Sequence, residues 1–267
     1  MITSLQNTKV KELIRLRDRR ARDETGLFLI EGYRELLRFH ETHHQAKALY
    51  YCPELFLGEN EQSLIDGLQA NGAELIPCSA DVFRKISYRD RPDGLLGVAA
   101  QIKRGLKDLE KILLKDRPPF LVVAEAIEKP GNLGTILRSS DAAGADGLIL
   151  CDRCTDLYNP NVVRASVGTL FTVPVFEATS EETIQFLKDH GISILAATPH
   201  ATLEYTKADL KKPVALAIGT EQLGLSELWM NQADLRVKIP MCGVADSLNA
   251  AMATVILLYE VHRQRAC

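Results

Sequence analysis

The sequence predicts an α/β protein whose C-terminal part is a mostly parallel β-sheet with helices on both faces. Three observations support this fold class. After Pro119, continuous apolar runs alternate regularly with helical segments, which is typical of parallel strands buried on both faces. A shorter series of strands and helices lies between Leu27 and Ile102. The length of 267 residues exceeds one comfortable core, so a second, smaller α/β domain is expected at the N-terminus.

The N-terminal region is expected to begin with a helix at residues 5–22, where apolar residues recur with partial helical periodicity and neither Pro nor Gly interrupts. The strands that follow are predicted at 27–30, 48–52, 74–77 and 95–102. The helices of this region are predicted near 32–41, 60–70 and 79–86. These elements alternate closely enough to form a small α/β domain of their own.

A charged segment at residues 103–118 separates the two regions. It favours a helix and ends at a Pro-Pro pair, as linkers commonly do. We therefore expect a smaller domain at residues 1–105, a linker at 106–118 and a larger domain at 119–267.

The larger domain is predicted to alternate six strands with five helices. The strands are expected at 120–126, 147–151, 172–176, 193–197, 214–218 and 235–239. The helices are expected near 132–143, 160–168, 180–190, 225–231 and 247–264. The last helix is apolar on nearly every side between Leu248 and Leu258. It is therefore either deeply buried or packed on another subunit over half of its surface.

The composition excludes several classes of protein. With 46% hydrophobic and 25% charged residues, the chain is ordinary for a soluble globular protein. It has no apolar run long enough for a membrane span, and its first residues lack the apolar core of a signal peptide. Its six cysteines do not have the spacing of a disulfide framework, so we expect a cytoplasmic protein with reduced thiols.

Positive charge is concentrated in two stretches although the net charge is −3. Residues 9–22 hold seven cations against Glu12 and Asp18, and residues 84–107 hold seven against two aspartates. Such a local surplus fits the footprint of a polyanion such as RNA. Two solvated surfaces without a ligand are the simpler alternative.

The turn at residues 128–138 delivers an arginine into the start of a helix that follows a buried strand. A Pro-Gly pair breaks the chain there, and Asn132 is a suitable N-cap. Arg138 lies about 140° around the helix from Leu133 and so points away from the apolar stripe. Ligands of parallel sheets bind at the carboxyl ends of strands. The turn therefore indicates a ligand site, unless Arg138 simply pairs with Asp141.

A second turn, Gly219–Gly224, follows the predicted strand at 214–218 and encloses Glu221 between its glycines. Glu221 can bind a hydroxyl or amino group, orient an arginine, or cap the next helix. The loop matches neither the dinucleotide-binding fingerprint nor a Walker loop. By itself it identifies no ligand.

A third segment leads from Ile239 into the last helix. Ser247 and Asn249 place short hydrogen-bonding side chains in the first turn of that helix. Capping by Asp246 or Ser247 explains one such residue. Capping then does not explain why an asparagine, Asn249, lies at the edge of this apolar helix.

A fourth strand-to-helix transition, at residues 159–168, carries a second arginine, Arg164. No metal site is expected elsewhere in the chain. Cys151 and Cys154 have CxxC spacing, but no second Cys or His pair lies nearby. The histidines show no ligand spacing, and no GxSxG nucleophile elbow is present.

Together these segments resemble the SpoU/TrmH branch of the SPOUT RNA methyltransferases. The three family motifs match in order, at plausible spacing, and their conjunction is more specific than any one of them. The matched residues are Asn132–Arg138 followed by Asn161, Arg164, Ser166 and Gly168, then Gly219–Gly224, then Ile239–Met241 and Ser247–Ala250. Residues 28–32 and 93–98 also resemble the family's N-terminal substrate-binding domain, which is similar to an RNA-binding fold of ribosomal proteins.

The resemblance implies an enzyme that transfers a methyl group from S-adenosylmethionine to a ribose 2′-hydroxyl of RNA, with large-subunit ribosomal RNA as the expected substrate. It also implies a deep trefoil knot at the cofactor site, which general rules of chain connection treat as a rare exception. Finally, it implies a homodimer whose interface includes the C-terminal helix, in agreement with the apolar character of that helix.

The resemblance implies three sets of site residues. The catalytic set is Arg138, Asn132, Glu221, Ser247 and Asn249. The cofactor-binding set is Thr198, Gly219, Glu221, Gly224, Ile239, Met241, Ser247, Leu248 and Ala250. The RNA-binding set is Arg164, Arg15, Arg19, Arg20, Arg89 and Arg91. Because arginine is almost always protonated, we expect Arg138 to organise the ribose or an adjacent phosphate, while a phosphate oxygen or water accepts the proton.

Three other functions are considered. A non-catalytic RNA-binding or ribosome-assembly factor on the same fold would have no reason to keep the whole catalytic set. A transfer-RNA methyltransferase would share the chemistry and differ in its substrate. A nucleotide-dependent oxidoreductase would need a glycine fingerprint after its first strand, which this chain lacks.

Overall fold

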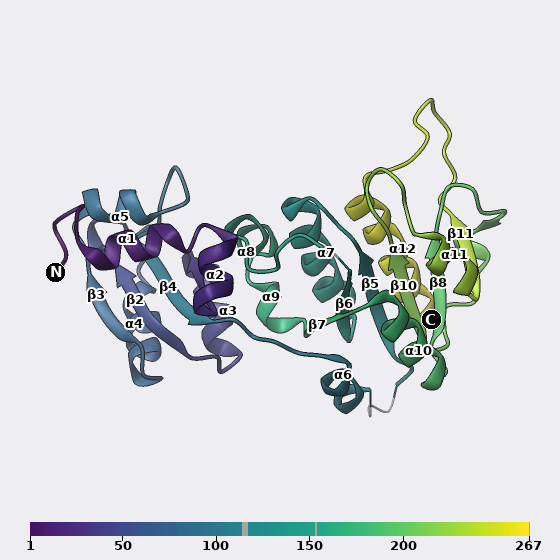
Figure 1. The fold of residues 1–267 in the computed structure, drawn as a ribbon, viewed down its shortest axis with the longest axis horizontal. Coiled ribbons are helices and arrows are strands. Elements are labelled where there is room, and N and C mark those ends of the chain that lie inside the picture. The colour runs from purple at the N-terminus through teal and green to yellow at the C-terminus, as the bar shows by residue number, and fades with distance from the viewer. Residues whose placement is uncertain (114–116, 153, 267) are drawn as a thin grey trace. The chain divides into compact units, whose positions relative to one another are not determined.

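The computed structural model describes residues 1–113, 117–152 and 154–266. It forms two compact units (Figure 1), each with its own sheet. The N-terminal unit consists of Met1–Ile102 together with Asp156–Thr172, and the C-terminal unit consists of Lys103–Thr155 together with the chain from Val173 onward. A segment within the expected larger domain, Asp156–Thr172, thus packs with the N-terminal residues. Among the described residues, no helix has both the length and the apolarity that a membrane span requires.

The N-terminal unit is built on a four-stranded sheet of order β1-β4-β2-β3, in which only β2 and β3 run parallel. Its strands are β1 (Leu27–Glu31), β2 (Ala46–Tyr51), β3 (Glu74–Pro77) and β4 (Leu95–Ala100). Its α-helices are α1 (Thr8–Arg15), α2 (Arg19–Thr25), α3 (Tyr33–Glu41), α4 (Glu61–Ala70), α5 (Ala80–Ile86), α8 (Pro160–Ser166) and α9 (Thr169–Thr172), with a 3-10 turn η1 (Pro53–Leu55). Helix α8 contacts β1 and α9 contacts α3, which anchors the second segment of this unit.

The predicted helix at residues 5–22 is wrong in its continuity, because the chain turns between α1 and α2. Arg22 explains the turn. Its side chain is buried, donates to the main-chain oxygens of Leu16 and Arg17 at 2.8 and 2.7 Å, and pairs with Asp156. Arg22 therefore does not contribute to the basic surface expected at 9–22. It joins the N-terminal helices to the segment that follows Thr155.

The C-terminal unit contains a seven-stranded sheet of order β7-β6-β5-β10-β8-β11-β9, and every pair in it is parallel. Its strands are β5 (Phe120–Glu125), β6 (Gly147–Cys151), β7 (Val175–Ala178), β8 (Ser193–Ala197), β9 (Leu203–Glu204), β10 (Val214–Ile218) and β11 (Leu235–Lys238). Its helices are α6 (Leu106–Ile112), α7 (Pro130–Ala143), α10 (Ser180–Asp189), α11 (Glu227–Gln232) and α12 (Ala250–Arg265), with a 3-10 turn η2 (Tyr205–Lys207). The predicted α/β class is confirmed.

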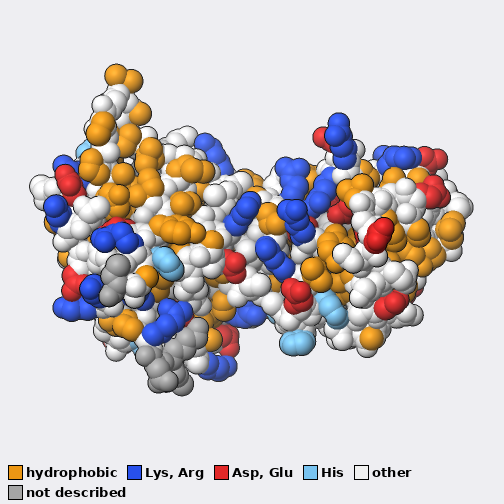
Figure 2. All heavy atoms as spheres, turned by 180° about the vertical axis from the view of Figure 1, so that it is seen from behind, with side chains coloured by type: hydrophobic (Ala, Val, Ile, Leu, Met, Phe, Trp, Pro, Cys, Tyr) orange, Lys and Arg blue, Asp and Glu red, His pale blue; other side chains and the backbone are white. Residues whose placement is uncertain are grey.

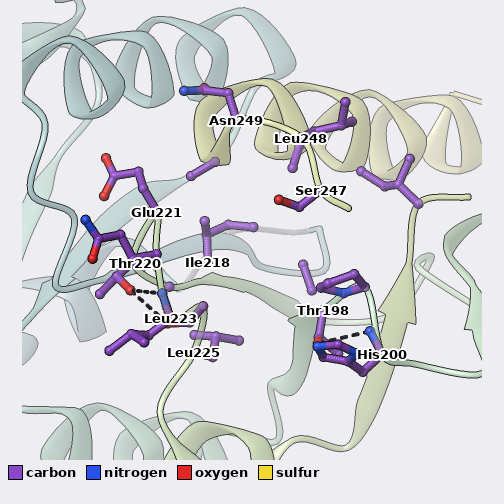
Figure 3. A pocket seen from close by; sticks show the side chains of 18 of the residues that line it. Thr198, His200, Ile218, Thr220, Glu221, Leu223, Leu225, Ser247, Leu248 and Asn249 are labelled. Carbon is purple, nitrogen blue, oxygen red and sulfur yellow. Dashed lines mark hydrogen bonds between the residues drawn. The ribbon is translucent and has the colours of Figure 1, made fainter. Parts of the chain in front are cut away.

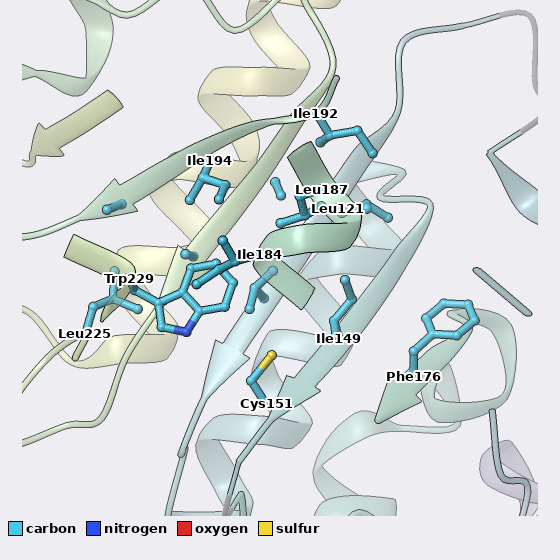
Figure 4. Packing of buried hydrophobic residues seen from close by; sticks show 14 of the residues in the cluster. Leu121, Ile149, Cys151, Phe176, Ile184, Leu187, Ile192, Ile194, Leu225 and Trp229 are labelled. Atoms are coloured by element: carbon cyan, nitrogen blue, oxygen red, sulfur yellow. The ribbon is translucent and has the colours of Figure 1, made fainter. Parts of the chain in front are cut away.

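Helices cover both faces of this sheet. On one face, Leu187 of α10 and Trp229 of α11 pack against strand residues such as Leu121 and Ile149 (Figure 4). Leu109 of α6 belongs to the same core. Helices α7 and α12 contact each other as well as β6 and β10, and take no part in that core, so they lie on the opposite face.

One local expectation for this unit needs correction. The strand expected at 172–176 lies at Val175–Ala178, because the preceding residues form the helical turn α9. The two-residue edge strand β9 was not predicted, since so short a segment shows no periodicity. The helical tendency expected of the linker is seen as α6, and residues 114–116 of that linker lie outside the described residues.

Candidate active site

The carboxyl ends of β8, β10 and β11 open into a pocket of about 570 Å³, a volume within the usual range for small-molecule sites. Each strand is continued by residues that line it: Thr198–His200 after β8, Gly219–Gly224 after β10, and Ile239 after β11. The start of α12 closes the remaining side (Figure 3). The site thus lies where parallel sheets generally bind ligands.

The loop Gly219–Gly224 forms one wall of the pocket and folds back on itself. The main chains of Thr220 and Gly224 exchange hydrogen bonds of 3.0 and 3.1 Å, and the Thr220 hydroxyl accepts a third from the N–H of Leu223 at 3.0 Å. A Cβ atom at position 219 would lie 2.1 Å from the Gly224 carbonyl group. Only glycine permits so close an approach of two main-chain segments.

A chain of side-chain hydrogen bonds joins the three predicted motifs. Asn249 Nδ2 donates to Asn132 Oδ1 at 3.1 Å, and Asn132 Nδ2 donates to Glu221 Oε1 at 2.6 Å. The three residues come from the start of α12, the first turn of α7 and the loop after β10. We call this chain the Asn–Asn–Glu relay. It holds together segments that are about ninety or more residues apart in sequence.

The relay has a fixed direction, because Asn249 Oδ1 accepts the main-chain N–H groups of Ala251 and Met252 at 3.0 and 3.3 Å. The Asn249 amide must therefore present its NH₂ group to Asn132. A flipped Asn132 would face that donor with its own NH₂ group and would set its oxygen against the Glu221 carboxylate. Neither arrangement makes a hydrogen bond.

The predicted N-caps of α7 and α12 are both wrong. The side chains of Asn132 and Asn249 take part in the relay. Asn132 lies inside the first turn of α7, whose N-cap is Lys129 with Pro130 at the first helical position, a favoured place for proline. The N-cap of α12 is Asn249 rather than Asp246 or Ser247. Asn249 thus has a local role as a cap and a second role in the relay.

Glu221 is the charged end of the relay. Burial acts to raise its pKa, but hydrogen bonds from its own main chain, from the Asn132 side chain and from the N–H groups of Glu128 and Lys129 together lower it. The carboxylate is therefore ionised at neutral pH. The pocket lining thus includes one carboxylate, Glu221, and one ammonium group, that of Lys129, among mostly uncharged residues; the carboxylate can face a cationic part of a ligand.

All nine residues expected to bind the cofactor line this pocket, as do Glu221, Ser247 and Asn249 of the catalytic set. Sequence reasoning missed several other lining residues, among them Lys129, Pro199, His200, Leu225 and Met230. The position of His200 was readable in principle, since it follows the predicted strand at 193–197 by only a few residues. Its proximity to Thr198, which the resemblance assigns to the cofactor site, was the available signal.

Arg138 and Asn132 do not line the pocket. Asn132 lies behind Glu221 in the relay. Arg138 is exposed on α7, six residues further on, and makes no hydrogen bond or ion pair with any residue that the structure describes. Its guanidinium is thus available to a ligand that approaches α7 from solvent.

The arginines expected to bind RNA fall into two groups. Arg15, Arg19, Arg20, Arg91 and Arg164 are exposed, and the first three form only exposed ion pairs with Asp23 or Glu24, which contribute little to stability. Arg89 is different, because it donates to the Glu35 carboxylate and to the Glu31 carbonyl oxygen, both at 2.7 Å. Its hydrogen bonds are directed into the protein.

Comparisons with known proteins cover both units. Residues 119–259 match the SpoU rRNA methylase family, and residues 7–97 match an MRM3-like substrate binding domain. The structure is similar to the crystal structure of an AdoMet-bound rRNA methyltransferase from Sinorhizobium meliloti, with a TM-score of 0.89 and 33% sequence identity over 98% of this chain and 97% of that chain.

Two relatives of known activity are similar over nearly the whole chain. The 23S rRNA (guanosine(2553)-2′-O)-methyltransferase RlmP of Bacillus subtilis is 28% identical over 97% of this chain and 98% of its own length. The 23S rRNA (uridine(2479)-2′-O)-methyltransferase of Streptomyces viridochromogenes is 32% identical over 94% of this chain and 87% of its own length. The chain described here therefore belongs to the SpoU rRNA methylase family.

Proposed function

We propose that this protein transfers a methyl group from S-adenosylmethionine to a ribose 2′-hydroxyl in large-subunit ribosomal RNA. The family, the enzyme class and the cofactor that the sequence predicts are confirmed by the relatives. The choice of large-subunit RNA is supported by the two relatives that act on different nucleotides of 23S rRNA. The observation that carries the proposal is the Asn–Asn–Glu relay, which joins the first motif to the two motifs that line one pocket.

The pocket has the chemistry that S-adenosylmethionine requires. Apolar side chains such as Ile218, Leu225 and Ile239 form walls suited to an adenine ring, and the glycine-rich loop brings main chain to the ligand. The Glu221 carboxylate offers a negative charge to a positively charged ligand. When bound, the cofactor supplies a methyl group on a cationic sulfur, which needs no further activation.

The relay residues act on position rather than on the transferred group. Asn132 fixes the Glu221 carboxylate, and Asn249 fixes Asn132 from the first turn of α12. Ser247 lines the pocket two residues before this cap. Holding the reacting groups in line can lower the activation barrier by several kcal/mol.

Arg138 is the residue we assign to the RNA. Its guanidinium is exposed, protonated and without a protein partner among the described residues. It can therefore bind the ribose or an adjacent phosphate in the bidentate geometry that arginine favours. Since a guanidinium does not accept a proton at neutral pH, the 2′-hydroxyl loses its proton to a phosphate oxygen or to water.

A transfer assay followed by mapping tests this function. Purified protein is incubated with ribosomal RNA from cells that lack it and with methyl-labelled cofactor, and ribose methylation is mapped by resistance of the neighbouring phosphodiester to alkali. One protected linkage in the large-subunit RNA is expected. Methylation of transfer RNA alone would reject the substrate, and cofactor binding without any transfer would favour the non-catalytic RNA-binding alternative.

We also propose that the protein is a cytoplasmic homodimer. Helix α12 buries Ala251, Leu257 and Leu258 in its own unit but leaves Met252 and Tyr259 52% and 48% exposed. Figure 2 shows hydrophobic side chains gathered on one face of the C-terminal unit. A second copy of the chain would cover such a face, as the sequence predicts for a helix that is apolar on nearly every side.

A further inference from the structure

The loop between α5 and β4 of the N-terminal unit is fastened by a buried carboxylate. Glu31, the last residue of β1, accepts the main-chain N–H of Tyr88 at 2.7 Å and that of Arg89 at 3.3 Å. It also accepts the hydroxyl of Ser87. Three successive residues of the loop are thus bound to one side chain.

Arg89 fastens the same loop from the other side. Its guanidinium donates to Glu35 Oε1 and to the Glu31 carbonyl oxygen, both at 2.7 Å, and lies 3.8 Å from the Asp93 carboxylate. Gly32 suits this site because its φ of +113° is one that L side chains rarely adopt, and a Cβ atom there would lie 2.5 Å from Arg89 Nη2. These contacts hold the loop at several points, with Arg89 as its positioning residue.

The network presents Tyr88 to solvent in a defined orientation. Tyr88 is 40% exposed although both ends of the residue are held: the main-chain N–H by Glu31, and the hydroxyl by a hydrogen bond of 3.0 Å donated by Asn161 Nδ2. A tyrosine on a surface loop ordinarily loses side-chain entropy when a ligand fixes it. Here the folded protein already fixes the Tyr88 side chain, so little side-chain entropy remains to be lost on binding.

Positive charge lies beside the ring. Arg164 follows Asn161 by one turn of α8 and lines the same shallow hollow as Tyr88. Arg91 lies three residues after Tyr88. Both guanidinium groups are exposed, and neither forms an ion pair with a residue that the structure describes. A held aromatic face with free cations next to it is the arrangement with which proteins bind unpaired nucleotides.

We propose that Tyr88 is a stacking platform for an unpaired base of the RNA substrate, with Arg164 binding an adjacent phosphate. The proposal takes RNA as the ligand from the proposed function, but it concerns a separate surface. Stacking requires a base that has left its helix, because a paired base offers no free face. The platform therefore selects a loop, bulge or strand end over a continuous duplex.

The test compares two RNA probes by fluorescence anisotropy: an oligouridine of about 12 nucleotides and a blunt-ended mixed-sequence duplex of similar length. Tyr88→Leu should weaken binding of the single strand at least about fivefold and leave duplex binding within about twofold. Tyr88→Phe keeps the ring and loses only the hydrogen bond to Asn161, so it should bind both probes nearly as the wild type does.

Two further variants separate stacking from charge and from positioning. Arg164→Ala should weaken both probes and reduce the salt dependence of binding by about one counterion, whereas Lys47→Ala, an exposed cation on β2, should do neither. Arg89→Ala should weaken the single strand in the wild-type background and have no additional effect in Tyr88→Leu, because it acts through the ring.

Several results would overturn the platform. These are equal losses for Tyr88→Phe and Tyr88→Leu, equal losses on single strand and duplex, unchanged binding by Tyr88→Leu, or no binding of the single strand by the wild type. Melting temperature and S-adenosylmethionine affinity serve as controls for folding. If the wild type methylates RNA while Tyr88→Leu binds normally, stacking alone is rejected. If the wild type and its variants bind the two RNA probes as expected but the wild type methylates no RNA, the proposed function is rejected and the platform is not.

Discussion

Breaking the Asn–Asn–Glu relay at its centre should weaken the active site without unfolding the protein. Asn132→Ala removes the 2.6 Å hydrogen bond to the Glu221 carboxylate and the 3.1 Å hydrogen bond from Asn249. A hydrogen bond to a charged group is worth about 1.5–3 kcal/mol. Because Glu221 is only half-buried and water can replace the lost donor, the lower end applies, which corresponds to a loss of about tenfold.

The assay is kcat/KM for methyl transfer, with cofactor affinity measured by calorimetry. Asn249→Ser is the informative second variant, because serine still caps α12 but does not reproduce the amide that reaches Asn132. Residues that act through one relay are not additive. The double variant Asn132→Ala/Asn249→Ser should therefore be no more than about twofold worse than Asn132→Ala alone.

Ser139→Ala, on the same helix but outside the relay, serves as the matched control and should retain wild-type kinetics. Two outcomes would refute the reasoning. One is full additivity of the two relay variants, which would mean that Asn132 and Asn249 act independently. The other is wild-type turnover by Asn132→Ala.

Four further predictions follow from the structure. Gly219→Ala should lower cofactor affinity at least about tenfold, since its Cβ would lie 2.1 Å from the Gly224 carbonyl group; titration calorimetry that finds normal affinity would contradict this. Arg138→Ala should abolish methyl transfer and leave cofactor affinity within about twofold, because Arg138 does not line the pocket; retained turnover removes it from the catalytic set. Arg22→Met should cost about 3–5 kcal/mol of unfolding free energy by leaving Asp156 without its buried partner, whereas Arg19→Met should cost about 0.5 kcal/mol or less; denaturant titration checks both. Met252→Asp should convert a dimer to a monomer in sedimentation equilibrium, and a monomeric wild-type protein would reject the proposed interface.

The strand ends were predictable because parallel strands leave a strong signal. Buried runs such as Val214–Ile218 are continuous, apolar and followed by glycine or polar residues. The carboxyl ends of such strands meet at one edge of the sheet. That rule, together with the three family motifs, placed the predicted cofactor-lining residues around one pocket.

The relay was not predictable, because its contacts depend on side-chain geometry between distant segments. Asn132 was interpreted as an N-cap because asparagine commonly has that role. Its actual partners, Glu221 and Asn249, are 89 and 117 residues away. Sequence spacing carries no information on such pairs.

Arg22 and Arg89 were misjudged for a related reason. Arginines are mostly exposed, so a basic stretch suggests a charged surface. Arg22 instead pairs with Asp156, 134 residues later, and Arg89 with Glu35, 54 residues earlier. In both cases the burial follows from a partner that only the fold brings close.

The central claim is that S-adenosylmethionine binds in the pocket lined by the second and third motif segments, which Asn132 of the first motif holds together, and a crystal structure of the protein with this cofactor bound tests it most directly. The account predicts density in the pocket between the Gly219–Gly224 loop and the start of α12, with the hydrogen bonds from Asn249 to Asn132 and from Asn132 to Glu221 intact. A cofactor bound elsewhere, or in this pocket with those hydrogen bonds broken, would contradict it.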